Sequence, residues 1–193
     1  MLEAEIQQSK SGQLAIAASG RGSFRRGSLV GQTAPSFKLQ DQDGSWVRLH
    51  DLLARGPFVL AFYPLDFSPV CTKQLRDYRD SYDAIQALGV RVVGISPDSP
   101  DRHREFITSN GLPFLLLSDP HHIVSRAYGV VPRWLSIKTR GLIVIGRDGS
   151  VVDERIETTM FTHRGAANVV KWLNGLKGRL YMQSVVRTIT MRT

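Results

Sequence analysis

A continuous apolar segment followed by a helical repeat is the clearest pattern in this chain. Residues 58–63 are all apolar or aromatic and are bounded by Gly56 and Pro64, which predicts a buried strand. After this segment, apolar side chains recur at steps of three and four residues up to Gly89, namely Leu75, Tyr78, Tyr82, Ile85 and Leu88. That period predicts a helix over residues 69–88 that ends at a glycine.

Strand and helix patterns continue to alternate downstream. Residues 90–95 predict a second apolar strand, which completes a βαβ unit with a right-handed crossover. The remaining pattern predicts helices over 102–110 (ended by Gly111), 121–128 (started by Asp119 and Pro120) and 166–176, and strands over 114–117, 140–145 and 151–156. The last two strands are joined by a turn at 147–150 and form a hairpin, and Val169, Val170 and Leu173 are expected on the inner face of the last helix. The sequence therefore predicts an α/β protein with a central mixed sheet, helices on both faces and an antiparallel edge hairpin.

Composition and charge indicate one domain with two tails. The 193 residues are 42% hydrophobic, which is sufficient for a single well-buried domain, placed here at residues 31–176. We expect residues 1–30 to be a poorly ordered N-terminal extension and residues 177–193 to be a basic C-terminal extension. The net charge of +8 lies mainly in these tails, because residues 31–170 carry sixteen basic and fifteen acidic side chains. We therefore expect no nucleic-acid partner, and no segment is long enough to cross a membrane.

The only cysteine, Cys71, falls where the first strand passes into the first helix. If Ser68 caps this helix and Pro69 takes its first position, Cys71 lies among the unpaired N–H groups of the first turn, where an anion is stabilised. An ordinary cysteine, with a pKa near ~8.5, is only about 3% thiolate at pH 7, and complete ionisation gains about thirty-fold. Any larger rate enhancement must come from orientation and from stabilising charge in the transition state.

Pro64, Ser68 and Cys71 form a Pro-x-x-x-Ser-x-x-Cys pattern that resembles the active-site signature of the peroxiredoxins, the AhpC/TSA superfamily. Similar blocks occur at 31–37, 43–44, 58–74, 93–96, 117–119, 128–130, 140 and 148–149, and the chain looks most like the bacterioferritin comigratory protein, or PrxQ-like, branch. The resemblance implies a thioredoxin-like fold. It also implies that Cys71 attacks the peroxide O–O bond, that Ser68 hydrogen-bonds the sulfur and the peroxide, that Pro64 shields the thiolate and that Arg140 completes the site.

Two positions depart from the pattern of this branch. Many of its members carry a second, resolving cysteine five residues after the first, where this chain has Arg76, and Gln74 stands where glutamate is common. Oxidised Cys71 must then be reduced by a thiol from another molecule. The resemblance thus implies a one-cysteine peroxidase, which is either a monomer or a homodimer.

Simpler structural roles are open for the same residues. Cys71 could be a buried small hydrophobe, Ser68 only a helix cap, and Arg140 a solvated arginine at a strand end. Arg140 has the same position relative to the turn at 148–149 as the arginine of the similar family, and this resemblance favours the functional role. For Arg76, a solvated helix arginine beside Asp77 and Asp80 is favoured over a contact with the thiolate.

No cofactor or metal is expected. Asp119, His121 and His122 do not form a metal site, because adjacent histidines of a helix cannot point the same way and no third ligand lies at suitable spacing; capping explains Asp119. Trp46, Trp134 and Trp172 are scattered, so they indicate packing and not base stacking.

The expected function is reduction of hydrogen peroxide and organic hydroperoxides through a cysteine sulfenic acid, with thioredoxin, glutaredoxin or a low-molecular-weight thiol as the external reductant. The alternative is a non-catalytic thioredoxin-fold redox sensor or holdase that signals through a mixed disulfide. A single cysteine suits a reducing compartment, so the expected location is cytoplasmic.

Overall fold

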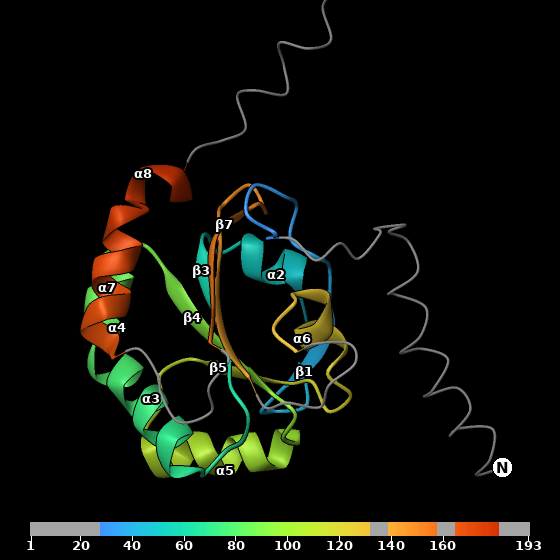
Figure 1. The fold of residues 1–193 in the computed structure, drawn as a ribbon. Coiled ribbons are helices and arrows are strands. Elements are labelled where there is room, and N and C mark those ends of the chain that lie inside the picture. The colour runs from blue at the N-terminus through green and yellow to red at the C-terminus, as the bar shows by residue number, and fades with distance from the viewer. Residues whose placement is uncertain (1–27, 132–138, 158–164, 182–193) are drawn as a thin grey trace, which may run out of the picture.

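The computed structural model describes residues 28–131, 139–157 and 165–181 (Figure 1). Its strands are β1 (Lys38–Asp41), β2 (Trp46–Arg48), β3 (Phe58–Phe62), β4 (Arg91–Ser96), β5 (Leu115–Ser118), β6 (Arg140–Ile145) and β7 (Val151–Glu157). Its helices are α2 (Leu49–Leu53), α3 (Pro69–Asp80), α4 (Tyr82–Gln86), α5 (Pro100–Asn110), α6 (Ile123–Ala127), α7 (Ala166–Gly175) and α8 (Lys177–Leu180).

All seven strands form one mixed sheet in the order β2-β1-β5-β4-β3-β6-β7. Strand β3 is parallel to β4, and β4 is parallel to β5. Strand β6 is antiparallel to β3 and forms a hairpin with β7 at the edge. The predicted α/β architecture and edge hairpin are confirmed. The pairing of Phe62 with Gly141 brings the first residue of β6 to the level where β3 ends and the Cys71 segment begins.

Helices cover both faces of the sheet, which explains why β3 is apolar at every position. In Figure 1, α3, α4 and α7 lie against one face and α2 and α6 against the other. Successive side chains of β3 point to opposite faces of the sheet and so pack in two different cores. Val59 and Ala61 pack in the core under α3 and α7. Phe58, Leu60 and Phe62 pack in the core under α2 and α6. Cys71 belongs to the first of these two cores.

Two predicted helices are divided or shortened in the structure. The helix expected over 69–88 ends at Asp80, and a second helix starts at Tyr82, because Ser81 leaves the helical conformation with φ −110° and ψ 14°. The helix expected from residue 121 begins at Ile123, because His122 takes a left-handed conformation with φ 54°. Asp119 still caps it, since its carboxylate accepts the N–H groups of Val124 and Ser125.

The N-terminal hairpin β1–β2 and the short helix α2 were not expected from the hydrophobic pattern. These elements are only three to five residues long, and β2 is half exposed, so they carry too few apolar positions to give a period. Their attachment to β5 comes from antiparallel pairing of Gln40 with Ser118, a contact distant in sequence.

The folded part extends past the predicted boundary at residue 176. Helix α8 follows, and Leu180 at its end is completely buried and accepts a backbone hydrogen bond from Arg147. At the other end, Gly31 donates to the backbone oxygen of Val151. The predicted extensions at 1–30 and 177–193 fall mostly outside the described residues.

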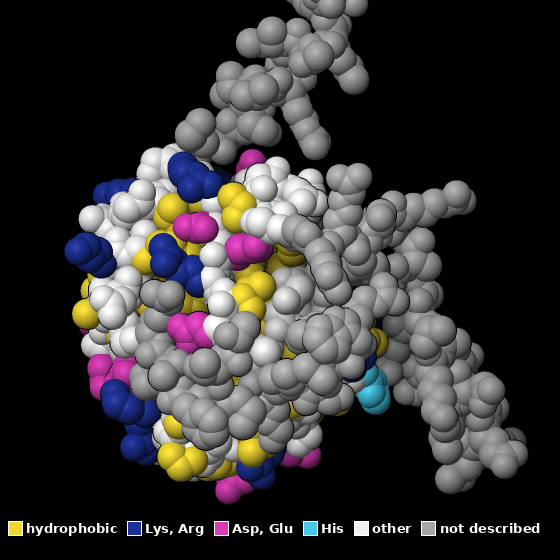
Figure 2. Space-filling model, viewed as in Figure 1, with side chains coloured by type: hydrophobic (Ala, Val, Ile, Leu, Met, Phe, Trp, Pro, Cys, Tyr) yellow, Lys and Arg dark blue, Asp and Glu magenta, His cyan; other side chains and the backbone are white. Residues whose placement is uncertain are grey.

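Charged groups of both signs are mixed on the face shown in Figure 2, with lysine and arginine side chains interspersed with acidic ones. This view agrees with the near balance of charges over residues 31–170. Within the described ranges, no helix has the length and apolar character needed to span a membrane.

Candidate active site

Cys71 lies in the first turn of α3, as the sequence predicts. Ser68 is the N-cap residue in an extended conformation, Pro69 occupies the first helical position, and the Ser68 hydroxyl accepts the backbone N–H of Cys71 at 3.4 Å. The proline has no N–H to leave unpaired, and the serine satisfies one of the free donors of the turn. The positive end of the helix is therefore directed at the cysteine.

The Cys71 side chain is completely buried, and the surrounding core includes Leu75 and Tyr78 from the same helix. A thiol in such surroundings is shielded from water, which strengthens every electrostatic contact made to its sulfur. Burial also restricts the access of reactants to the sulfur. The structure thus combines the helix-start position of a reactive cysteine with the burial of a core residue.

Arg140, the first residue of β6, is only 2% exposed and is not a solvated strand-end arginine. Its Nη1 donates to Oε1 of Gln74, which is also buried. Gln74 follows Cys71 by three positions on α3, so the two side chains lie on the same face of the helix. The fold therefore brings a buried cation from β6 to the cysteine face of α3, which the sequence predicted only through the family resemblance.

Tyr78, one helical turn after Gln74 on α3, joins the buried hydrogen-bonded pair of Arg140 and Gln74. Its hydroxyl accepts from Nε2 of Gln74 at 2.9 Å, so Gln74 links the tyrosine to Arg140. Burial raises the pKa of Tyr78 to about 12; the Gln74 hydrogen bond and the Arg140 charge act in the opposite direction, and the negative charge of Glu157 adds to the rise. The sequence pattern marks Tyr78 only as a core residue, because helical periodicity does not distinguish a buried hydroxyl from a buried ring.

Arg76, which occupies the position of the resolving cysteine in many similar proteins, is directed away from the site. Its Nε donates to Oδ1 of Asn110 at the end of α5, at 2.8 Å. Neighbouring acidic groups are engaged elsewhere, since Asp77 pairs with Lys73 and Asp80 with Arg79. Arg76 is exposed, as expected for a solvated helix arginine, and it adds a specific contact between α3 and α5.

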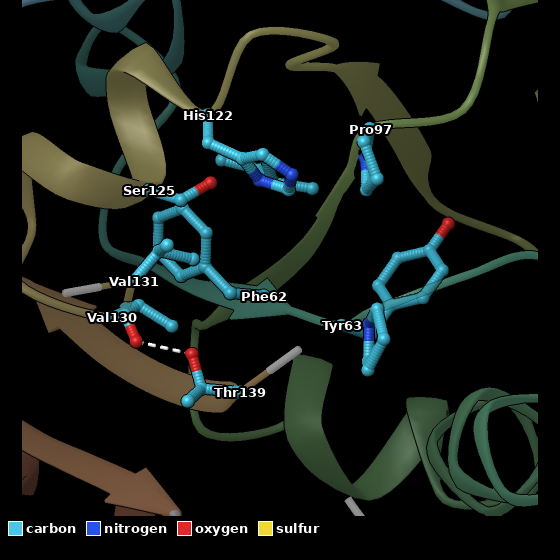
Figure 3. Close-up of a pocket in the computed structure, with 10 residues that line it drawn as sticks. Phe62, Tyr63, Pro97, His122, Ser125, Val130, Val131 and Thr139 are labelled. Atoms are coloured by element: carbon cyan, nitrogen blue, oxygen red, sulfur yellow. Dashed lines mark hydrogen bonds between the residues drawn. The ribbon is translucent and has the colours of Figure 1, made fainter. Parts of the chain in front are cut away.

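Pro64 is buried in the segment between β3 and α3 and borders a narrow cavity of about 40 Å³ (Figure 3). The cavity wall is mainly apolar and includes His122, Ser125 and Thr139 among its polar members, and Thr139 donates to the backbone oxygen of Val130. Cys71, Ser68 and Arg140 do not line it. The cavity is thus adjacent to the cysteine segment and separate from the sulfur itself.

Metal binding has no support in the described part of the chain, where no group of three or more His, Cys, Asp or Glu side chains is placed to hold an ion. Asp119 is instead fully engaged, since it also accepts from the Ser125 hydroxyl. Trp46 and Trp172 lie on different elements, with Trp172 donating to Asp153, while Trp134 lies outside the described residues.

A thioredoxin-like α/β fold with a capped cysteine at the start of a helix and a buried arginine on the adjacent strand defines the general class of the protein. The family model described as AhpC/TSA family matches residues 30–154, and the chain belongs to that family. The predicted fold and the resemblance to peroxiredoxins of the PrxQ and bacterioferritin comigratory branch are confirmed.

Individual relatives agree with this assignment. The chain is 45% identical over 100 residues to the chloroplastic peroxiredoxin Q of Populus jackii, covering 52% of this chain and 46% of that protein. It is 40% identical over 102 residues to peroxiredoxin Bcp of Bacillus subtilis, covering 52% and 64%. The crystal structure of peroxidoxin BcpB from Mycobacterium tuberculosis matches with a TM-score of 0.68 at 31% identity, covering 79% of this chain and 98% of that chain. The chain spans about half the length of the first of these curated relatives.

Proposed function

We propose that this chain is a thiol-dependent peroxidase that reduces hydrogen peroxide and organic hydroperoxides with Cys71 as its nucleophile. The observation that carries this proposal is the arrangement around α3: Cys71 lies in the capped first turn, and a buried Arg140 is held on the same helical face through Gln74. The names of the similar proteins, peroxiredoxin Q and peroxiredoxin Bcp, support the same chemistry.

The first half of the reaction is a displacement at oxygen. The Cys71 thiolate donates an electron pair to one peroxide oxygen, the O–O bond breaks, and the other oxygen leaves with a proton as water or an alcohol. Sulfur is oxidised to a sulfenic acid, and negative charge moves from sulfur to oxygen in the transition state. The roles proposed for Ser68 and Arg140 are to stabilise that charge, and the role proposed for Pro64 is to exclude water.

The second half needs a thiol from another molecule, because the sequence contains one cysteine. A reductant thiol condenses with the sulfenic acid, water leaves, and a mixed disulfide forms; a second thiol then releases reduced Cys71 and carries away the disulfide. Because Cys71 is completely buried, we propose that the first turn of α3 opens before this thiol reaches the sulfur. We propose the cytoplasm as the compartment, since this cycle depends on a supply of reduced thiols.

Intact-mass spectrometry after one equivalent of peroxide tests the first half-reaction. Sulfenic acid and methionine sulfoxide each add one oxygen, and the chain has four methionines, so a dimedone trap and the Cys71→Ser variant distinguish them. The parent chain is expected to gain one dimedone adduct and Cys71→Ser none, together with loss of peroxide consumption and an unchanged circular dichroism spectrum. Continued peroxide turnover by Cys71→Ser would contradict the proposal.

Recycling is tested by adding thioredoxin, glutaredoxin and a low-molecular-weight thiol separately to the oxidised protein. Return of the parent mass with one of them, followed by a second round of peroxide consumption, is the expected result. Rapid stoichiometric oxidation with no turnover in the presence of any of these reductants would instead favour the redox-sensor or holdase function.

A further inference from the structure

A second buried polar group lies beneath the segment that leads into α3. The carboxylate of Asp66, which is completely buried, accepts the hydroxyl of Tyr63 at 2.7 Å and contacts Nδ1 of His103 at 2.7 Å. The backbone N–H of Asp66 donates to Oδ2 of Asp98, which also accepts from the Ser96 hydroxyl. The segment after β3, the loop after β4 and helix α5 therefore meet at Asp66, the loop through its backbone N–H and the other two through its carboxylate.

The partners of this group are all buried side chains. His103 is completely buried, and its Nε2 has no hydrogen-bond partner among the described residues. The Nδ1 contact with Asp66 is therefore the one side-chain hydrogen bond of this ring among the described residues. Asp66 thus lies between two buried partners, the Tyr63 hydroxyl and the His103 ring.

The residue after Asp66 has an unusual backbone. Phe67 takes a left-handed conformation with φ 61°, which is sterically unfavourable for a bulky side chain. Its ring packs edge-on against Phe106 at 4.9 Å and lies 5.2 Å from the Arg102 guanidinium. Arg102 in turn pairs with Asp98 at 2.9 Å and donates to the backbone oxygen of Asp66. Contacts on both sides of the turn therefore hold a conformation that the residue itself disfavours.

This turn determines where α3 begins. Ser68, the next residue, is the cap whose hydroxyl accepts the N–H of Cys71. If the backbone at Phe67 relaxed to a negative φ, the direction of the chain would change immediately before the cap. The Ser68 hydroxyl would then no longer meet the first turn of the helix.

We propose that Asp66, held by Tyr63 and His103, is a positioning residue for the reaction of Cys71. It fixes the left-handed turn at Phe67, and through that turn it sets the Ser68 cap and the orientation of the cysteine. The proposal rests on the peroxidase function proposed above for its effect on peroxide, but it also predicts a change in access to Cys71 that does not depend on that function.

Two variants of the histidine and one of the tyrosine form the test. His103→Leu removes the donor to Asp66, whereas the amide of His103→Asn can still provide an N–H at a similar position. Tyr63→Phe removes the other donor with almost no change in volume. His50→Leu is the control, because the His50 side chain is 90% exposed and belongs to a surface pair.

The first measurement is the second-order rate constant for Cys71 oxidation by hydrogen peroxide, taken well below each variant's unfolding temperature. We expect His103→Leu to lower it about 10- to 100-fold and Tyr63→Phe about 3- to 10-fold, with His103→Asn within about 3-fold of the parent. The second measurement is alkylation of Cys71 by iodoacetamide, which should become several-fold faster in His103→Leu because a loosened first turn exposes a buried sulfur.

Opposite changes in the two rates, with recovery in His103→Asn, are the signature of positioning. A purely structural role would lower the unfolding temperature of His103→Leu and leave both rates unchanged, and that result would overturn the proposal. If His103→Leu does not fold, Tyr63→Phe decides the matter by the same two rates. A parent chain that does not react with peroxide would contradict the peroxidase function, while the alkylation comparison would still decide whether Asp66 sets the helix start.

Discussion

Replacing Arg140 by methionine tests the site most directly, because it removes a buried cation and retains an unbranched side chain of similar length. Arg140 is 2% exposed and donates to Gln74, on the cysteine face of α3. Its charge therefore acts in a water-excluded region, where an oriented donor is worth more than it is in solution. We expect slower attack of Cys71 on peroxide.

The expected size of the effect distinguishes two causes. Ionisation alone can change the rate by at most about thirty-fold, since an ordinary thiol is about 3% ionised at pH 7. Loss of a donor directed at developing oxygen charge typically costs roughly 10²- to 10³-fold. We therefore expect Arg140→Met to be slower by about 10²- to 10³-fold at pH 7, and to remain slower at a pH where alkylation shows that Cys71 is fully ionised.

The assay is rapid mixing with hydrogen peroxide, quenching by an alkylating reagent, and intact-mass measurement over a range of pH. Arg140→Lys is the companion variant, because it keeps the positive charge and loses the planar guanidinium that reaches Gln74. Its rate should lie between those of the parent and Arg140→Met. Full recovery of Arg140→Met at high pH would show that the arginine acts only on ionisation, and an unchanged rate at every pH would refute its place in the site.

The remaining predictions concern the helix start, the buried tyrosine and close packing. Ser68→Ala should slow peroxide reduction and lower the free energy of unfolding by about 1 kcal/mol, and Ser68→Thr should restore both; full activity with lower stability in Ser68→Ala would make Ser68 only a cap. Burial raises the pKa of Tyr78 to about 12 in the folded state, against about 10 when unfolded, so its contribution to stability is complete below pH 10. That contribution is lost as the pH rises toward 12, by up to roughly 3 kcal/mol. Urea unfolding of Tyr78→Phe should therefore show a weaker decline between pH 10 and 12 than the parent, and parallel declines would contradict this reasoning. Gly94→Ala should cost about 1–3 kcal/mol in urea unfolding, because a Cβ there would lie 2.4 Å from Leu116, and a variant as stable as the parent would show that the strand can shift to make room.

Local chemistry in the sequence was sufficient to predict most of the elements and the start of α3. The apolar run of β3, the period of α3 and the Ser68-Pro69 pair each act within a few residues, so their consequences are visible without the rest of the chain. The same is true of Gly111, which ends α5 in a left-handed conformation with φ 57°. Elements with little local signal were missed, including the β1–β2 hairpin, whose place depends on pairing with β5.

The composition of the site depended on contacts between distant segments. The sequence around residue 140 does not predict that Arg140 is buried against Gln74, because the two residues are 66 positions apart. They meet because β6 pairs with β3, next to α3. Asp66 and His103 are also distant in sequence, at 37 positions apart. From its local sequence, Asp66 is an ordinary polar residue of a loop and His103 an ordinary polar residue of a helix. Sequence by itself determined that Cys71 lies in a capped first turn, because a helix start is a local property. Only the tertiary structure decided which buried polar groups meet, because the free energy of burying a polar or charged group depends on partners that the fold alone brings into contact.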